Sequence, residues 1–209
     1  WNKGEQHLKE ALNISLKINN TQQISNSYGF LGWCCHDRSE YVQAKEYFKK
    51  MLEIDEKIGA KAYQIYDYQW IAMNYIELGE IDKARTLLDD LHKFAHEKQD
   101  KWLIANEDAT RGMLLRAEKK WNESIELFEK SLQEYEALGA RRWNVYWLAR
   151  IPLYEYARAY LESDQPGDKE KAGNLLSQAL EIYQKLGAKK DIEKVEARIA
   201  FIETGKEVS

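Results

Sequence analysis

The sequence predicts an all-α fold in which antiparallel helical hairpins stack into a right-handed superhelical solenoid. Only 2 of the 209 residues are proline and 11 are glycine, which favours long helices joined by short turns. A small side chain recurs along the chain with a period of 40, and only the last step is longer, at 48. A large apolar side chain follows each small one by four residues, at the spacing of one helical turn.

The repeat is defined by two helices, each with its own small residue. The small residues of the second helix are Gly4, Ala44, Ala84, Ser124 and Ala172. The large residues four places later are Leu8, Phe48, Leu88, Phe128 and Leu176. The first helix of each complete repeat has its small residue at Gly32, Ala72, Gly112 or Ala157. A small residue lets two helix backbones approach and a large one fills the adjoining groove, so each helix pair should form an antiparallel hairpin.

This register predicts one repeat domain over residues 1–209. Its segments are the second helix of a truncated repeat at 1–20, complete repeats at 21–60, 61–100, 101–140 and 141–188, and a closing helix with its tail at 189–209. Because the register begins inside a repeat, we expect the chain to be a segment of a larger protein.

The individual helices follow from these repeats in order. We expect them near residues 2–18, 22–38, 42–58, 62–78, 81–98, 101–118, 121–138, 142–163, 168–186 and 190–203. Glycines that can adopt a left-handed backbone should end helices at Gly59, Gly139 and Gly187, and Gly79 should form a turn within a hairpin. Pro152 lacks a backbone N–H and should bend or break the eighth helix.

The pattern resembles the tetratricopeptide repeat family. The segment "YQWIAMNYIELGEIDKARTLLDDL", residues 68–91, has the family's spacing of small and large side chains. The period of 40 exceeds the usual length of about 34, and Ser39 and Lys119 replace a glycine between helices. The longer period is similar to a subclass found C-terminal to signalling ATPases and nucleotide cyclases, whose repeats often end in "LGAK". HEAT-type repeats have a similar length but lack this small-residue pattern.

Composition excludes several classes of function. A net charge of −4 and a pI near 5.7 argue against direct binding of nucleic acid. No apolar run approaches the length of a membrane span. Cys34 and Cys35 are adjacent, which is poor geometry for a mutual disulfide, so we expect free thiols and a cytoplasmic location.

The chain offers few groups for catalysis, and we expect neither enzymatic activity nor a cofactor. His92 and His96 are four residues apart on one helical face, where a metal site is conceivable. However, His92 occupies a position that is leucine in the other repeats, and nothing obvious completes the coordination sphere. We therefore interpret both histidines as surface or packing residues, and Cys35 as a core residue.

The resemblance implies a concave groove lined by the first helix of each hairpin. Family positions map onto Asn26, Trp33, Asp37, Tyr66, Gln69, Met73, Trp102, Asn106, Met113, Arg116, Trp147, Tyr154 and Arg158, all expected outside the hairpin core. Amides can bond an extended peptide backbone while aromatic faces supply buried area. The alternative is that the tryptophans pack between neighbouring hairpins.

These observations predict a non-enzymatic module that binds a protein or peptide, as the sensory or docking region of a larger regulatory protein. Two alternatives remain. The chain is a passive scaffold that associates through its outer surface or ends, or it is a small-molecule-sensing repeat domain. The open N-terminal end of the truncated repeat favours self-association.

Overall fold

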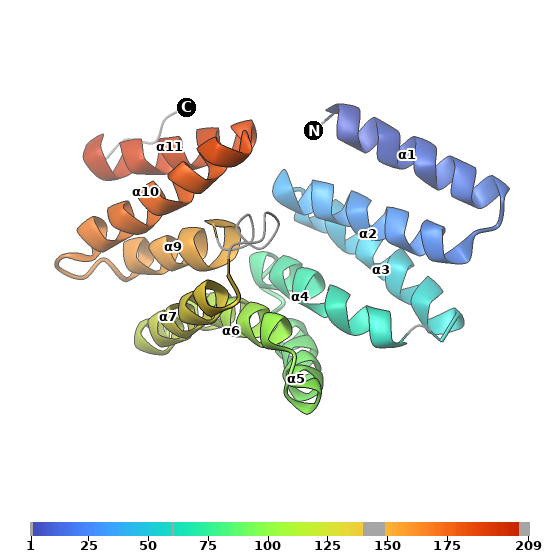
Figure 1. Cartoon of the computed structure of the whole chain (residues 1–209), viewed down its shortest axis with the longest axis horizontal. Helices are drawn as coiled ribbons and strands as arrows, with labels where there is room; N and C mark the ends of the chain where they lie inside the picture. The colour runs from blue at the N-terminus through green and yellow to red at the C-terminus, as the bar shows by residue number, and fades with distance from the viewer. Residues whose placement is uncertain (1, 60, 140–148, 205–209) are drawn as a thin grey trace. The chain divides into compact units, whose positions relative to one another are not determined.

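A computed structural model describes residues 2–59, 61–139 and 149–204, and it describes only the backbone of residues 2, 61–66 and 149. These residues form helices joined by short turns, and no strand occurs among them (Figure 1). The helices are α1 (Asn2–Lys17), α2 (Thr21–Asp37), α3 (Tyr41–Lys57), α4 (Lys61–Glu77), α5 (Ile81–Lys98), α6 (Lys101–Ala117), α7 (Trp121–Ala137), α9 (Tyr154–Ser163), α10 (Asp168–Leu186) and α11 (Lys189–Thr204). No described helix is long and apolar enough to cross a membrane.

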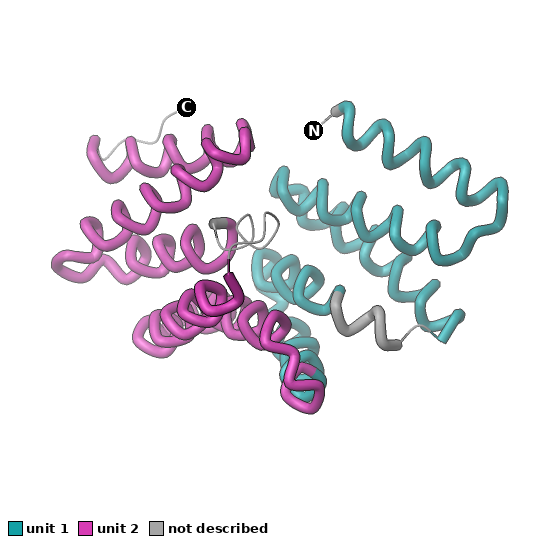
Figure 2. Tube along the Cα trace, in the orientation of Figure 1, with its two compact units in different colours: residues 1–94 teal, residues 95–209 magenta. Residues whose placement is uncertain are grey.

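The chain divides into two compact units, residues 1–94 and residues 95–209 (Figure 2). In the first unit α1 packs on α2, α2 on α3 and α3 on α4. In the second unit α6 packs on α7, α7 on α9, α9 on α10 and α10 on α11. Successive helices therefore pack as neighbours within each unit, which confirms the predicted helical repeat fold.

The predicted helix bounds agree with the structure to within one residue for every helix that the structure describes in full. Two first helices begin at side-chain caps that the sequence supplies. Asn20 accepts a hydrogen bond from the backbone N–H of Gln23 at 3.1 Å, and Asp100 accepts one from Leu103 at 3.0 Å. Such caps satisfy backbone donors that the first turn of a helix leaves unpaired.

The eighth predicted helix is interrupted where proline was expected to disturb it. Residues Ala149–Leu153 form a π-helical turn that contains Pro152, and the regular α-helix α9 begins only at Tyr154. A proline cannot donate the usual backbone hydrogen bond, and a wider turn accommodates its ring. The remainder of the predicted helix, residues 142–148, lies outside the described residues.

The small and large residues of the repeat meet as predicted. The small residues of the second helices, Ala44, Ala84, Ser124 and Ala172, are all fully buried. A Cβ atom added to Gly32 on α2 would lie 2.8 Å from the ring of Phe48 on α3. The same contact recurs two repeats later, where a Cβ atom on Gly112 would lie 3.1 Å from Phe128. Glycine therefore permits the closest approach of the two helices in each of these hairpins.

Buried hydroxyl groups join the two helices in the α2–α3 and α6–α7 hairpins. Ser25 on α2 donates to Asp55 on α3 at 2.5 Å. In the second unit, Ser124 and Ser131 on α7 donate to the backbone carbonyls of Gly112 and Ala105 on α6, at 2.8 and 2.7 Å. These bonds satisfy buried polar groups and hold the register of the two helices.

The turn within each hairpin needs a residue with a left-handed backbone. Gly79 has a φ angle of +72°, and Ser39 and Lys119 take the same conformation with φ angles of +62° and +61° at the equivalent positions. A side chain beyond glycine is disfavoured there because its Cβ crowds the following carbonyl oxygen. The two substitutions noted in the sequence are thus accommodated with some backbone strain.

We expect Ser39→Gly and Lys119→Gly each to raise the free energy of unfolding by about 0.5–1 kcal/mol, because glycine relieves this strain. Thermal melts followed by circular dichroism would measure the change. Gly79→Ala is the matched control and should lower the stability by a similar amount. A decrease for both glycine variants would contradict this interpretation of the turns.

Candidate binding site

Three aromatic side chains gather on the neighbouring helices α2 and α4 of the first unit. The ring centroids of Trp33 and Trp70 lie 5.1 Å apart with an interplanar angle of 32°. Phe30 lies 6.4 Å from Trp33, and 51% of its surface is exposed, whereas the two tryptophans are partly buried. We call Phe30, Trp33 and Trp70 the aromatic patch.

The repeat places these three rings together. Phe30 and Trp70 are separated by one repeat period and so occupy the same position in successive first helices. Trp33 follows Phe30 by three residues, which puts both on one face of α2. Because α2 and α4 pack against each other, Trp33 on α2 meets Trp70 on α4. Sequence analysis named Trp33 but missed Phe30 and Trp70, although the repeat period relates them.

Polar groups flank the aromatic patch on α2. Asn26 is exposed one turn before Phe30, and its Oδ1 accepts a hydrogen bond from Gln22 Nε2 at 3.2 Å. Asp37 is partly buried and follows Trp33 by four residues. Both belong to the predicted groove set. Together with the rings they offer hydrogen-bonding groups beside an apolar surface.

A buried polar network joins the two helices that carry the patch. Nδ1 of His36 on α2 lies within hydrogen-bond distance, 3.2 Å, of Asn74 Oδ1 on α4. Asn74 Nδ2 donates to the backbone carbonyl of Tyr41, at the start of α3, at 3.0 Å. The network joins three helices, so the rings of the patch are held on a firm scaffold.

The other predicted groove residues on α4 do not lie on an open face. Gln69 and Met73 are both buried, whereas the sequence placed them outside the hairpin core. The side chain of Tyr66 lies outside the described residues. Within α4, Trp70 therefore provides the aromatic surface next to α2.

In the second unit, too, some residues that the sequence analysis assigned to the groove lie in the core. Asn106 is 1% exposed and accepts a hydrogen bond from the hydroxyl of Tyr135 on α7 at 2.6 Å, while its Nδ2 donates to the Trp102 carbonyl at 2.6 Å. Met113 is buried as well, and Trp102 is partly buried. Asn106 joins α6 to α7, and the prediction that it lies outside the hairpin core is wrong.

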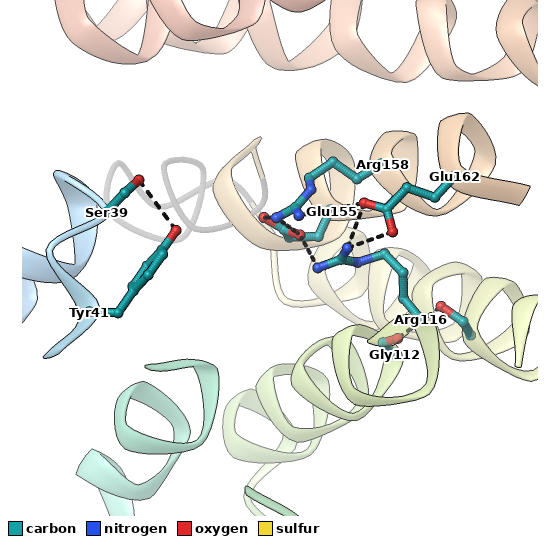
Figure 3. A network of polar contacts seen from close by, with 8 residues as sticks. Ser39, Tyr41, Gly112, Arg116, Glu155, Arg158 and Glu162 are labelled. Atoms are coloured by element: carbon teal, nitrogen blue, oxygen red, sulfur yellow. Dashed lines mark hydrogen bonds and ion pairs between the residues drawn. The ribbon is translucent and has the colours of Figure 1, made fainter. Parts of the chain in front are cut away.

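The two predicted arginines come together in an ion-pair network between α6 and α9 (Figure 3). Buried Arg116 donates from Nη1 to both carboxylate oxygens of Glu162, at 2.6 and 2.8 Å. Its Nη2 lies 3.4 Å from Glu155, and Arg158 Nη1 lies 3.1 Å from the same carboxylate. Each arginine is thus matched by carboxylates of this chain, which gives the network no net positive charge for an anionic ligand.

Sequence analysis missed Glu155 and Glu162, although their spacing from Arg158 by three and four residues is a signal for helical ion pairs. Burial raises the pKa of Glu155, but the charges of Arg158, Arg116 and Lys194 outweigh it and lower that pKa below its ordinary value. Of the remaining predicted groove residues, Tyr154 is buried, and Lys194 lies 4.3 Å above its ring. Trp147 lies outside the described residues.

A cleft of about 200 Å³ lies between α3 and α4, and its lining includes Asn74 but none of the three rings of the patch. Its lining includes the apolar side chains of Leu52 and Ile71 and the charged groups of Lys45, Lys49 and Glu53. Sites for small molecules usually measure roughly 300–1,000 Å³. This cleft is therefore a weaker candidate for a ligand than the aromatic patch.

The candidate metal and thiol groups have ordinary surroundings. His92 and His96 are both exposed on α5, and no group of three potential ligands gathers in the part of the chain that the structure describes. Cys34 and Cys35 are both free thiols, as predicted. Cys35 is buried in the core of the first unit, and burial raises its pKa to about 11, which leaves the unreactive thiol form.

Two comparisons with known proteins bear on the family. Tetratricopeptide repeat models match residues 25–58, which cover most of the α2–α3 hairpin, and residues 68–94, which cover much of α4 and α5. No curated protein matches the chain. Tetratricopeptide repeats generally mediate protein–protein interactions and are typically binding modules rather than enzymes. The two matched segments and the stacked helical hairpins together support a tetratricopeptide repeat protein.

Proposed function

We propose that this chain is a non-enzymatic module that captures an extended peptide, or an extended segment of a partner protein, on the aromatic patch of α2 and α4. The observation that carries the proposal is the exposure of Phe30, half of whose surface faces solvent while its ring lies beside the Trp33–Trp70 pair. A large aromatic ring at the surface beside two further rings offers a partner apolar area that water solvates poorly.

The composition of the patch suits a peptide. Tryptophan and other aromatic residues dominate the energetics of many interfaces because they bury a large area with little loss of side-chain freedom. The amide of Asn26 and the carboxylate of Asp37 can bond the backbone N–H groups of an extended chain alongside these rings. The polar network that joins α2 to α4 would hold the patch in place and reduce the entropy lost on binding.

We extend the proposal to the protein's setting. The long repeat period and the "LGAK" sequence at residues 186–189 support a docking or sensing region of a larger regulatory protein in the cytoplasm, where a captured segment would signal to other domains. Protein or peptide is the partner that we propose in that setting, in preference to a small molecule. The small volume of the α3–α4 cleft supports that preference.

Phe30→Ala should weaken peptide binding by about 5- to 1,000-fold, the range expected for a central aromatic contact. Because Phe30 is half exposed, its removal should change the melting temperature little. The ligand would first be selected from a library of linear peptides displayed on phage. Isothermal titration calorimetry with the selected peptide would then compare the variant and the parent chain.

Val42→Ala is the matched control, because Val42 on α3 is also an exposed apolar residue, at 71%, but does not belong to the patch. It should leave the affinity unchanged. If Phe30→Ala and Trp33→Ala bind the peptide as tightly as the parent chain does, the proposed site is wrong. If Val42→Ala alone loses binding, the outer surface would replace the patch as the site.

A further inference from the structure

Two carboxylates accompany the aromatic patch, one on each of its helices. Asp37 follows Phe30 by seven residues on α2, and Glu77 follows Trp70 by seven residues on α4. Seven residues are close to two turns of an α-helix, so the ring and the carboxylate share one face of each helix. Both carboxylates are partly buried, and each belongs to the last residue of its helix.

The last turns of α2 and α4 lie against each other. His36 Nδ1, next to Asp37, lies 3.2 Å from Oδ1 of Asn74, which comes three residues before Glu77. The two carboxylates therefore belong to neighbouring helix ends, beyond the Trp33–Trp70 contact.

This combination of ring and carboxylate coincides with the patch. The next first helix, α6, holds Thr110 and Ala117 at the equivalent positions, so it supplies neither a ring nor a charge there. The acidic positions are thus a feature of the two helices that carry the aromatic rings, and the repeat pattern alone does not require them.

Positive charge is scarce on these helices. α2 contains no lysine or arginine, and Lys61 of α4 is the first residue of that helix, at the opposite end from Glu77. Arg38 follows α2 directly, but it donates to Glu5 at 2.6 Å and to Glu40 at 2.9 and 2.7 Å. The carbonyl groups at the C-terminal end of a helix add partial negative charge. The end of the patch where α2 and α4 finish is therefore electronegative.

We infer that the segment captured on the aromatic patch carries an arginine whose guanidinium stacks on the tryptophan rings. From there its N–H groups would reach the carboxylates of Asp37 and Glu77. This inference rests on the proposed function and adds the chemistry of the partner. Tryptophan is the side chain whose ring attracts a cation most strongly. Charge complementarity selects this occupant, since an acidic segment would meet two like charges at the same place.

Arginine suits this surface better than lysine. Its guanidinium is planar, so it can stack on an aromatic face while its N–H groups bond a carboxylate in the plane of the group. An ionised carboxylate has about four acceptor sites, so Asp37 can bond the guanidinium and a backbone N–H of the same segment together.

Selection from the phage-displayed library of linear peptides on the 209-residue chain gives the first test. The selected peptides should be enriched in arginine and depleted in aspartate and glutamate relative to the starting library. A selected peptide would then be synthesised with citrulline in place of the arginine. Citrulline keeps the length and the planar end of arginine but has no charge, so binding measured by calorimetry should weaken by roughly 5- to 30-fold.

A double-mutant cycle identifies the carboxylates that meet the guanidinium. Asp37→Asn and Glu77→Gln should each weaken binding of the arginine peptide by roughly three- to tenfold and leave binding of the citrulline peptide unchanged. A carboxylate that serves folding alone would weaken both peptides equally, which would overturn its assigned role. Glu46→Gln is the matched control, because Glu46 is an exposed carboxylate on α3, and it should change neither affinity.

Phe30→Ala separates this inference from the proposed function. If binding requires Phe30 but the selected peptides show no enrichment in arginine, the inference is wrong and the proposed function stands. The same holds if the citrulline peptide binds as tightly as the arginine peptide. Binding that is insensitive to both Phe30→Ala and Trp33→Ala would overturn the inference and the proposed function together.

Discussion

Ala84→Arg should lower the free energy of unfolding by at least about 3 kcal/mol. Ala84 is fully buried on α5, and Leu88 one turn later is fully buried too. An arginine at this position would overpack the helix contact, and its charge would have to leave water. For a chain of about this length, the loss should lower the melting temperature by roughly 6–12 °C.

Thr86→Arg is the control for this experiment, since Thr86 lies two residues away on the same helix and is exposed. It should change the melting temperature by little. Circular dichroism melts of both variants would decide the matter. An unchanged midpoint for Ala84→Arg would show that the small residues of the repeat do not mark the helix contacts.

Arg116→Met should destabilise the chain by about 3 kcal/mol at pH 7. The variant removes the bidentate partner of Glu162 and one of the two arginines beside buried Glu155. A buried carboxylate that loses a positive neighbour keeps its desolvation cost without the matching attraction. Urea unfolding of the variant and the parent chain would measure the loss.

The pH dependence, together with a second substitution at Glu155, tests whether Glu155 is the cause. Its pKa is lowered below the ordinary value of 4.5 in the folded chain, so its contribution to stability is present above that value and is lost as the pH falls. The penalty of Arg116→Met should therefore be greatest near neutral pH and shrink in acid, where a protonated Glu155 no longer needs Arg116. Adding Glu155→Gln should restore part of the stability, whereas a penalty that is constant with pH would exclude this explanation.

The helices could be predicted from the sequence because their main determinants are local. The four-residue spacing of small and large side chains, the left-handed glycines and Pro152 each act within a few residues of chain. Ser39 and Lys119 lack the expected glycine, yet the register of the flanking helices places the turns at those residues.

The candidate site was harder to predict because exposure depends on which helix faces meet. Asn106 has the residue type and the repeat position expected of a groove amide. In the structure it instead accepts a hydrogen bond from the buried hydroxyl of Tyr135, which lies 29 residues further along the chain. The two preceding repeats hold Asp55 and Ala95 at the position of Tyr135, so the repeat pattern did not predict this hydrogen bond. Phe30 and Trp70 show the opposite case, since the period relates them and only the structure reveals that each lies beside Trp33.

The indole N–H signals of the tryptophans test the central claim most directly. Each of the seven tryptophans gives one such signal in a ¹H–¹⁵N spectrum, and single Trp→Phe variants would assign them. On titration with the selected peptide, the signals of Trp33 and Trp70 should shift together while that of Trp121, on α7 in the second unit, stays in place. Binding that shifts Trp121 but leaves Trp33 and Trp70 unchanged would contradict the account.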